Sequence, residues 1–173
     1  MATILSHGVA AVALGRLYAG REKQPAAFWI TIIGLSMLPD VDVLGFRFGI
    51  HYADLWGHRG MTHSLLFAVI VGTLAAWCMK RFISPGDFFP LTLLFSLVII
   101  SHGLLDALTN GGLGVAFFAP FHAQRYFFPW RPIRVSPMGA AFFSARGWLV
   151  LKNEMVWIWL PSAAVFLLGL LLA

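Results

Sequence analysis

Long apolar stretches separated by short polar segments dominate the chain. The apolar runs cover residues 4–20, 26–38, 61–79, 91–108 and 155–173. A transmembrane helix needs about 20 predominantly apolar residues, so the runs at 61–79 and 91–108 are predicted to span a membrane. The run at 4–20 lies at the lower limit of this length, and Pro161 interrupts the last run. The pattern predicts an all-α, polytopic membrane protein with about four to five transmembrane or partly embedded helices.

Two longer stretches of mixed polarity interrupt this pattern. Residues 43–57 carry glycines, charged residues and a tryptophan, and are predicted to form a loop or interfacial segment. Residues 113–153 contain four prolines and four arginines among many aromatic residues. Aromatic and basic side chains suit the membrane interface, so residues 113–153 are predicted to form a long amphipathic loop lying in that interface.

Shorter breaks divide the remaining chain. Polar turns are expected at residues 21–25 and 84–90. A helix break is expected near Leu38, because Pro39 disfavours helical geometry at the residue before it. The length suits one domain, so residues 1–173 are predicted to form a single membrane-embedded domain.

Composition supports a membrane protein and changes how the basic charge is interpreted. Hydrophobic residues make up 60% of the chain and charged residues only 11%, whereas soluble domains carry about 25% charged residues. The net charge is +5, which in a soluble protein would suggest nucleic acid. Here the basic residues are expected to contact anionic lipid headgroups. No basic run is interleaved with aromatics, so membrane lipids are predicted partners and nucleic acid is not.

Histidines and aspartates are predicted to gather on one face of the membrane. If the first apolar run crosses the membrane and each later run crosses back, the polar ends of four segments fall on the same side. The residues that share this side are His7, Asp40, Asp42, His58, His63, His102 and Asp106. Polar groups at such positions are costly to keep and usually have a function.

The stretch from His58 to Ser64 is the densest part of this set. It contains two histidines, Arg59, Thr62 and a serine, directly before an apolar run. The planar fork of Arg59 suits a phosphate, although a snorkelling anchor is the alternative. Thr62 and Ser64 are candidates to hydrogen-bond a ligand or to orient a histidine.

The His/Asp set has the chemistry of a divalent-metal site. His102 and Asp106 are four residues apart on a predicted helix, so their side chains share one side. Imidazole nitrogens and carboxylate oxygens suit zinc, manganese or a related ion. Such a metal makes bound water a nucleophile near neutral pH. A buried hydrogen-bonded His102–Asp106 pair and a solvated Asp40–Asp42 turn remain the structural alternatives.

The ordered motifs resemble a known family. His7, Pro39-Asp40-Val41-Asp42, His58-Arg59-Gly60-Met61-Thr62-His63-Ser64 and His102-Gly103-Leu104-Leu105-Asp106 look like those of the predicted membrane-bound metal-dependent hydrolases, the YdjM-like, LexA-regulated inner-membrane family. The resemblance covers roughly residues 1–115 and implies metal-dependent hydrolysis in the bacterial inner membrane.

A fainter similarity, to zinc-dependent phospholipase C and nuclease motifs, implies a phosphoester or phospholipid substrate. The matching positions, and hence the expected metal ligands, are His7, Asp40, His63, His102 and Asp106. The chain departs from that group in having only His122 after the last pair. Zinc is the preferred metal, with manganese as the alternative.

Three functions follow from these observations. The first is a metal-dependent hydrolase, in which metal-activated water attacks a phosphoester or another ester of a lipid-like substrate. Its expected catalytic residues are Arg59, His58 and Asp42. The second is a metal-binding transporter, whose site would normally lie near the bilayer midplane. The third is a non-catalytic membrane protein.

Lysines and arginines lie in the short turns at 16–23 and 80–81, on the face opposite the histidines and aspartates. They predict that this opposite face is cytoplasmic and that the site is extracytoplasmic.

Overall fold

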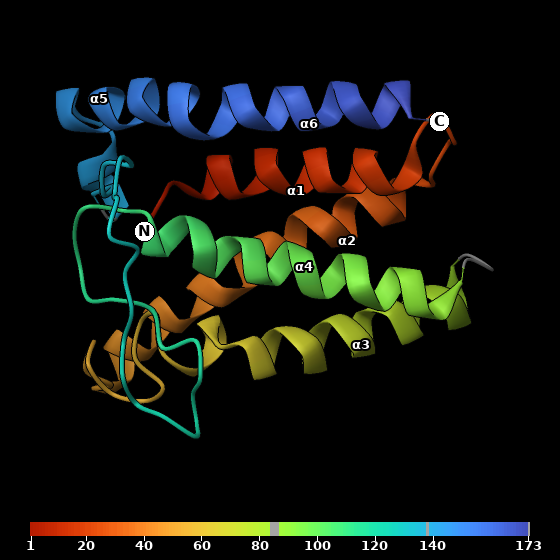
Figure 1. Cartoon of the computed structure of the whole chain (residues 1–173). Coiled ribbons are helices and arrows are strands. Elements are labelled where there is room, and N and C mark those ends of the chain that lie inside the picture. The colour runs from red at the N-terminus through yellow and green to blue at the C-terminus, as the bar shows by residue number, and fades with distance from the viewer. Residues whose placement is uncertain (84–86, 138, 173) are drawn as a thin grey trace.

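Six α-helices carry the fold in the computed structural model, which describes residues 1–83, 87–137 and 139–172 (Figure 1). The helices are α1 (Ile4–Ala19), α2 (Ala26–Met37), α3 (Leu65–Phe82), α4 (Phe88–Ala107), α5 (Ala145–Glu154) and α6 (Leu160–Leu171). Short 3-10 segments η1 (Leu38–Phe48), η2 (Met61–His63) and η3 (Gly139–Phe142) and the π-helical segment η4 (Met155–Trp159) lie between them. Residues 84–86 of a predicted turn, Met138 of the predicted loop and Ala173 lie outside the described residues.

The predicted all-α membrane class is confirmed. Four helical stretches in the described part of the chain are long and apolar enough to cross a membrane, namely Ala26–Phe48, Leu65–Phe82, Phe88–Ala107 and Ala145–Leu171. The first helix, α1, has 16 residues and is therefore about 24 Å long. It falls short of the roughly 30 Å hydrocarbon core of a bilayer.

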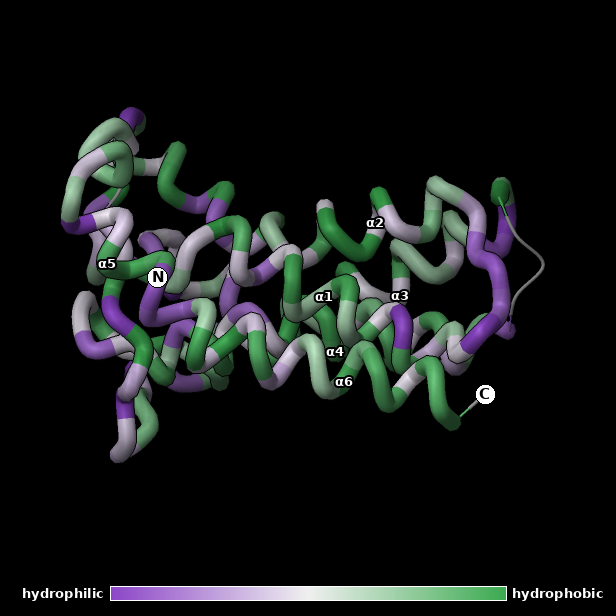
Figure 2. Tube along the Cα trace, turned by 90° about the horizontal axis from the view of Figure 1, so that it is seen from above, coloured by the Kyte–Doolittle hydropathy of each residue, from purple (hydrophilic) through white to green (hydrophobic). Residues whose placement is uncertain are grey.

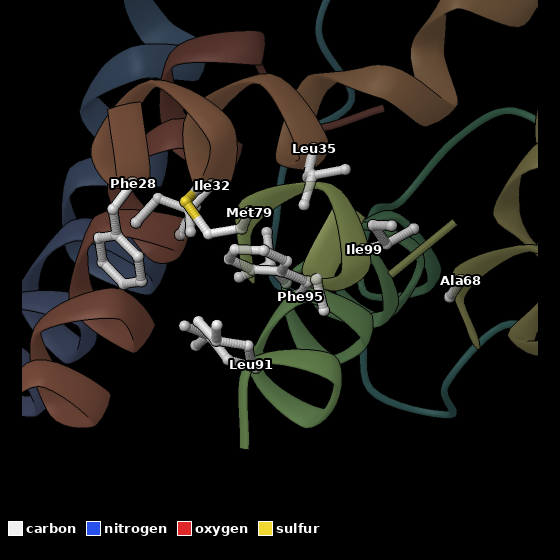
Figure 3. Close-up of a cluster of buried hydrophobic side chains, with 12 residues drawn as sticks. Phe28, Ile32, Leu35, Ala68, Met79, Leu91, Phe95 and Ile99 are labelled. Atoms are coloured by element: carbon white, nitrogen blue, oxygen red, sulfur yellow. The ribbon is translucent and has the colours of Figure 1, made fainter. Parts of the chain in front are cut away.

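The helices pack around α1 and α4. Helix α1 contacts α2, α4 and α6, while α3 packs chiefly on α4. Apolar side chains from the first four helices form one buried cluster (Figure 3), which includes Ala11, Phe28, Ile32, Leu35, Ala68, Met79, Leu91, Phe95 and Ile99. Lipid tails are as apolar as these side chains, so close packing rather than exclusion from water stabilises helix contacts within a bilayer.

Glycines allow the closest helix approaches. A Cβ atom on Gly72 of α3 would lie 2.6 Å from the backbone nitrogen of Ser96 in α4. A Cβ atom on Gly169 of α6 would lie 2.7 Å from the carbonyl oxygen of Arg16 in α1. Both distances are shorter than real contacts allow, so only glycine permits these pairs of backbones to come together.

Hydrophilic residues gather at the two ends of the bundle, and the middle is mostly apolar (Figure 2). One end brings together the beginnings of α1 and α3 and the ends of α2 and α4. The predicted alternation of helix directions is therefore confirmed. It places the histidines and aspartates of four segments at this same end.

The predicted break near Leu38 is confirmed, but it is a change of helix type. Helix α2 ends at Met37, and the chain continues as the 3-10 helix η1 with Pro39 in its first turn. Proline is tolerated there because its fixed φ suits a first turn and its missing N–H is not needed. Of the two predictions for residues 43–57, a loop or an interfacial segment, the loop is wrong for residues 43–48, since η1 ends at Phe48 and is capped by Gly49, which has φ 80°.

The predicted loop at 113–153 is also too long. Residues 145–154 form α5, whose N-cap Ser144 accepts a hydrogen bond from the backbone N–H of Gly147. The polar residues of α5 resemble a loop in sequence, but they form the first part of one continuous helix that runs to Leu171. Pro161 does not break this helix, because it lies in the first turn of α6, directly after η4.

Candidate metal centre

The seven histidines and aspartates predicted to share one face form a single buried cluster. They come from α1, η1, η2 with the segment before it, and the end of α4. None of the seven is more than 8% exposed. Ionisable side chains are rarely buried unless they are paired or bind a metal, so this cluster needs a chemical explanation.

Four members surround one point. Asp40, His63, His102 and Asp106 each offer a ligand atom, and these four atoms lie within 4.8 Å of one another. The two Nε2 atoms of His63 and His102 are 3.1 Å apart. Asp40 Oδ1 lies 3.3 Å from Nε2 of His102 and 3.7 Å from Nε2 of His63. Ligands of a tetrahedral ion with bonds near 2.1 Å are separated by about 3.4 Å, so these separations fit a small divalent cation.

The backbone and a carboxylate orient the two imidazole rings. Nδ1 of His102 lies 2.7 Å from the carbonyl oxygen of Ser36, which can only accept, so Nδ1–H donates and Nε2 keeps its lone pair. Nδ1 of His63 lies 3.2 Å from Asp42 Oδ2. An acceptor behind each ring is the arrangement typical of metal-ligating histidines.

Two residues of the cluster contain buried polar atoms without hydrogen-bond partners among the described residues. These atoms are both ring nitrogens of His7 and both carboxylate oxygens of Asp40. The ring of His7 stacks on His102 with centroids 3.7 Å apart, and its Nε2 lies 3.6 Å from Asp106 Oδ1. Buried polar atoms without partners cost free energy, and a bound cation would supply the missing partner. The donor set therefore fits a metal.

Asp42, only two residues from Asp40, has the opposite environment. Its Oδ1 lies 2.8 Å from His58 Nδ1. Its Oδ2 accepts from Thr62 Oγ1 at 2.7 Å and from the backbone N–H of Arg59 at 3.2 Å. Thr62, predicted to hydrogen-bond a ligand or to orient a histidine, thus lies between Asp42 and His63, with its Oγ1 3.0 Å from His63 Nδ1. Asp42, His58 and His63 also meet the geometric requirement for holding an ion, but Asp42 takes part in three hydrogen bonds, whereas Asp106 accepts two and Asp40 none among the described residues.

Arg59 is placed differently from the phosphate contact predicted from the sequence. Its side chain is 0% exposed, and its Nε donates to Asp106 Oδ2 at 3.0 Å. The remaining nitrogens donate to the carbonyls of Gly111 and Leu113 and to Thr109 Oγ1. Arg59 also has φ 64°, an unusual conformation for a residue other than glycine that surrounding contacts must maintain. These contacts hold Asp106 and leave no guanidinium edge for a substrate.

The two neighbouring aspartates favour a charged His63 when no cation is bound. Burial by itself lowers the pKa of His63, but Asp40 and Asp42 outweigh this effect and raise the pKa to about 9. The charged imidazolium and a cation would occupy the same space between the carboxylates. A proton must therefore leave His63 before its Nε2 can bind a metal.

Two residues outside the cluster, Arg125 and Ser64, also depart from the predictions. Arg125, expected to contact lipid headgroups, instead donates to the backbone carbonyls of His58, Tyr52 and Asp54. It thereby joins the segment 52–58 to the loop that contains Arg125. Ser64 caps α3 by accepting from the N–H of Phe67. His51 and His122 are exposed and do not join the cluster.

The sequence reasoning missed Glu154. This residue is 0% exposed and accepts hydrogen bonds from Thr3 and Ser6 at the beginning of α1. The available signal was a carboxylate directly before an apolar helix, a position where an ionisable residue needs a partner. The assignment of residues 113–153 to a loop obscured this signal.

Similarity to known proteins agrees with this architecture. The model of the YdjM inner membrane protein family matches residues 1–173. The chain is 36% identical over 172 residues to Inner membrane protein YbcI of Escherichia coli (strain K12), covering 99% of this chain and 97% of that protein. No solved structure matches. The predicted inner-membrane localisation is confirmed by these names together with the four apolar helices. The chain belongs to the YdjM inner membrane protein family.

Proposed function

We propose that this protein is a membrane-bound metal-dependent hydrolase. The observation that carries the proposal is the buried point shared by His63, His102, Asp40 and Asp106, whose ligand atoms lie within 4.8 Å of one another. His7 is the candidate fifth ligand, since neither of its ring nitrogens has a partner among the described residues. Zinc, manganese or a related divalent ion suits this mixture of imidazole and carboxylate donors.

The proposed chemistry divides between the cation and the side chains around it. A divalent cation supplies Lewis acidity, which polarises a phosphoryl or carbonyl oxygen and makes water more acidic. Asp42 orients two histidines, because one of its oxygens faces His58 Nδ1 at 2.8 Å and the other faces His63 Nδ1 at 3.2 Å. His58, paired with a carboxylate in this way, is the proposed proton acceptor for the attacking water.

We assign Arg59 a positioning role in this reaction. The guanidinium group holds Asp106 and three acceptors near it, so it fixes a ligand and offsets negative charge near the cation. Transition-state charge on a phosphoryl or acyl oxygen would then be stabilised chiefly by the cation itself. Arg59 is therefore proposed to act by holding Asp106, and not as the phosphate clamp that its sequence position predicts.

A lipid-like ester is the substrate class that the surroundings favour. A cavity of about 580 Å³ lies beside the beginning of α1 and is lined by residues 1–5, 43, 44, 46, 47, 136, 137, 139 and 142. Ala2 forms part of its wall and donates its backbone N–H to Asp106 Oδ1 at 2.8 Å. Ala2 therefore lies between the cavity and a proposed metal ligand. Its lining is mostly apolar, with Arg47 as the one charged side chain among the described lining residues. An acyl chain with an anionic headgroup matches this combination.

The position of the cluster favours hydrolysis over transport. Transport sites typically lie near the middle of the bilayer, whereas every proposed ligand lies at one end of the helix bundle. That end also carries polar loops (Figure 2), which suit the membrane interface better than the bilayer core. Uptake of zinc or manganese into proteoliposomes would reverse this preference.

Purified protein provides the test. We expect stoichiometric zinc or manganese by elemental analysis, and metal-dependent release of product from phospholipid or a generic phosphoester. His102→Ala is expected to abolish both. Gly34→Ala is a matched control, because a Cβ atom on Gly34 meets nothing within 4 Å. Metal-loaded protein that hydrolyses no ester, or a His102→Ala variant with full activity, would overturn the proposal.

A further inference from the structure

Glu154 and Trp159 of the last helix both contact the beginning of α1. Glu154 accepts from the backbone N–H of Thr3 at 2.7 Å, from Thr3 Oγ1, and from Ser6 Oγ at 2.7 Å. Trp159 Nε1 donates to the same Ser6 Oγ at 2.8 Å. A fully buried carboxylate in a membrane helix is expensive, and the catalytic scheme above does not use it.

The π-helical segment explains how two residues five apart reach one hydroxyl group. In an α-helix, with 3.6 residues per turn, residues five apart point about 140° away from each other. In η4 the backbone N–H of Leu160 instead bonds to the carbonyl of Met155, the i to i+5 pattern of a π-helix. The wider turn brings Glu154 and Trp159 to the same side, facing Ser6. Such π turns occur frequently at functional sites.

The beginning of α1 connects these contacts to the metal centre. Ser6 directly precedes His7, and Ala2 donates its backbone N–H to Asp106 Oδ1 at 2.8 Å. No hydrogen bond to a described residue holds the ring of His7, so its position depends on the backbone of α1 and on stacking against His102. A movement of the first turn of α1 would therefore move a proposed ligand directly.

We propose that Glu154 and Trp159 are positioning residues for the metal centre. The π turn aligns both side chains on Ser6, and the first turn of α1 transmits their position to His7. This inference rests on the proposed function, since it presumes that His7 binds the cation. It assigns a purpose to a buried carboxylate and to an irregular helix segment some 150 residues from the ligand that they position.

Cobalt binding to the full-length protein tests the proposal without measuring activity. Co²⁺ reports the arrangement of its ligands through its visible absorption bands, so affinity and spectrum are read together. Glu154→Ala is expected to weaken Co²⁺ binding by about 10–100-fold, the loss typical of residues that orient ligands, and to shift the bands. Trp159→Phe, which removes only the N–H donor, is expected to change both in the same direction by a smaller factor. Glu154→Gln keeps an acceptor oxygen and is expected to restore part of the loss.

Two comparisons separate positioning from general stabilisation. Phe95→Ala, in the apolar cluster of Figure 3, is expected to lower thermal stability and to leave the cobalt bands unchanged. In a His7→Ala background, Glu154→Ala and Trp159→Phe are expected to cause no further loss of Co²⁺ affinity, because residues acting through one intermediary are not additive.

The outcomes are distinguishable. If the unmodified protein binds no Co²⁺, the proposed function fails and this inference fails with it. If the protein binds Co²⁺ and Glu154→Ala lowers only thermal stability, as Phe95→Ala does, the inference alone is overturned. If Glu154→Ala does not fold, Trp159→Phe decides, and unchanged affinity and bands in that variant would overturn the inference.

Discussion

Asp40 and Asp42 represent two halves of the same buried cluster. Both aspartates lie in η1 and both are largely shielded from solvent. Asp42 is surrounded by hydrogen-bond donors, from His58, Arg59 and Thr62. Asp40 has none among the described residues. Asp42 therefore supports its neighbours through its hydrogen bonds, whereas the unpartnered oxygens of Asp40 are available to bind a cation.

The basic residues show the same division of roles. Arg59 and Arg125 both lie at the end of the bundle that holds the cluster, and both donate mainly to groups of this chain. Only Arg59 reaches a proposed metal ligand, Asp106. Removing Arg59 should therefore affect cation binding, whereas removing Arg125 should affect chiefly the stability of the loop that it holds.

The largest effect is expected at the ligands themselves. His102→Ala removes a nitrogen that lies 3.3 Å from Asp40 Oδ1 and 3.1 Å from His63 Nε2. We expect zinc binding, measured by competition with a chromophoric chelator, to fall by more than about 100-fold, beyond the range that supporting residues produce. His122→Ala, at an exposed histidine, is the matched control and should bind zinc normally. Equal affinities for the two variants would contradict this assignment.

A smaller loss is expected for a residue that supports a ligand. Arg59→Lys keeps the charge and removes the planar fork that reaches Asp106 and Thr109. Zinc affinity should fall by about 10-fold or somewhat more. Arg125→Lys should leave zinc affinity unchanged and lower the thermal unfolding temperature. The comparison would break down if Arg125→Lys weakened zinc binding as much as Arg59→Lys.

The two aspartates should differ in the metal-free protein. Asp42→Asn loses acceptors for buried donors and should lower the free energy of unfolding by about 1–3 kcal/mol. Asp40→Asn should cost less than Asp42→Asn, because both carboxylates stabilise the charged His63 but only Asp42 also accepts hydrogen bonds from described residues. Denaturation of chelator-treated protein checks this difference. A metal-free Asp40→Asn variant that is less stable than Asp42→Asn would show that Asp40 has a structural role.

The smallest effect concerns pH. The pKa of His63 is raised from 6.5 to about 9, so its charged form stabilises the metal-free protein fully below about pH 6.5. This stabilisation should be lost as pH rises to about 9, while zinc affinity should increase over the same range because fewer protons must be displaced. Thermal unfolding and zinc titration across this range measure the two slopes. His63→Gln should lose the unfolding slope attributed here to His63, whereas His51→Gln, at an exposed histidine, should keep it.

Much of the site can be predicted from the sequence because it depends on local periodicity. The spacing of His102 and Asp106 places both on one side of α4, and the alternating apolar runs bring their end of the helix to Asp40 and His63. The membrane class follows from run length and composition in the same way. These properties depend only on the order and spacing of residues.

The remaining features depend on contacts between distant segments. Arg59 has a left-handed backbone conformation, and its side chain donates to carbonyl groups about 50 residues further along the chain. No local pattern at that position predicts either feature. Glu154 meets Thr3 and Ser6 across about 150 residues. The π turn that aligns Glu154 with Trp159 has no signature in an apolar run. Helix α5, which precedes it, resembles a polar loop in sequence because its polar residues find their partners only in the folded protein.

Anomalous X-ray diffraction from zinc-loaded crystals tests the central claim most directly. One zinc peak is expected within about 2.0–2.2 Å of Nε2 of His63 and His102 and of an oxygen from each of Asp40 and Asp106. Asp42 and His58 should remain hydrogen-bonded to each other and outside the coordination sphere. A peak between Asp42 and His58 with none at the inner point, or no bound zinc at all, would contradict the assignment of the inner set as the metal-binding half of the cluster.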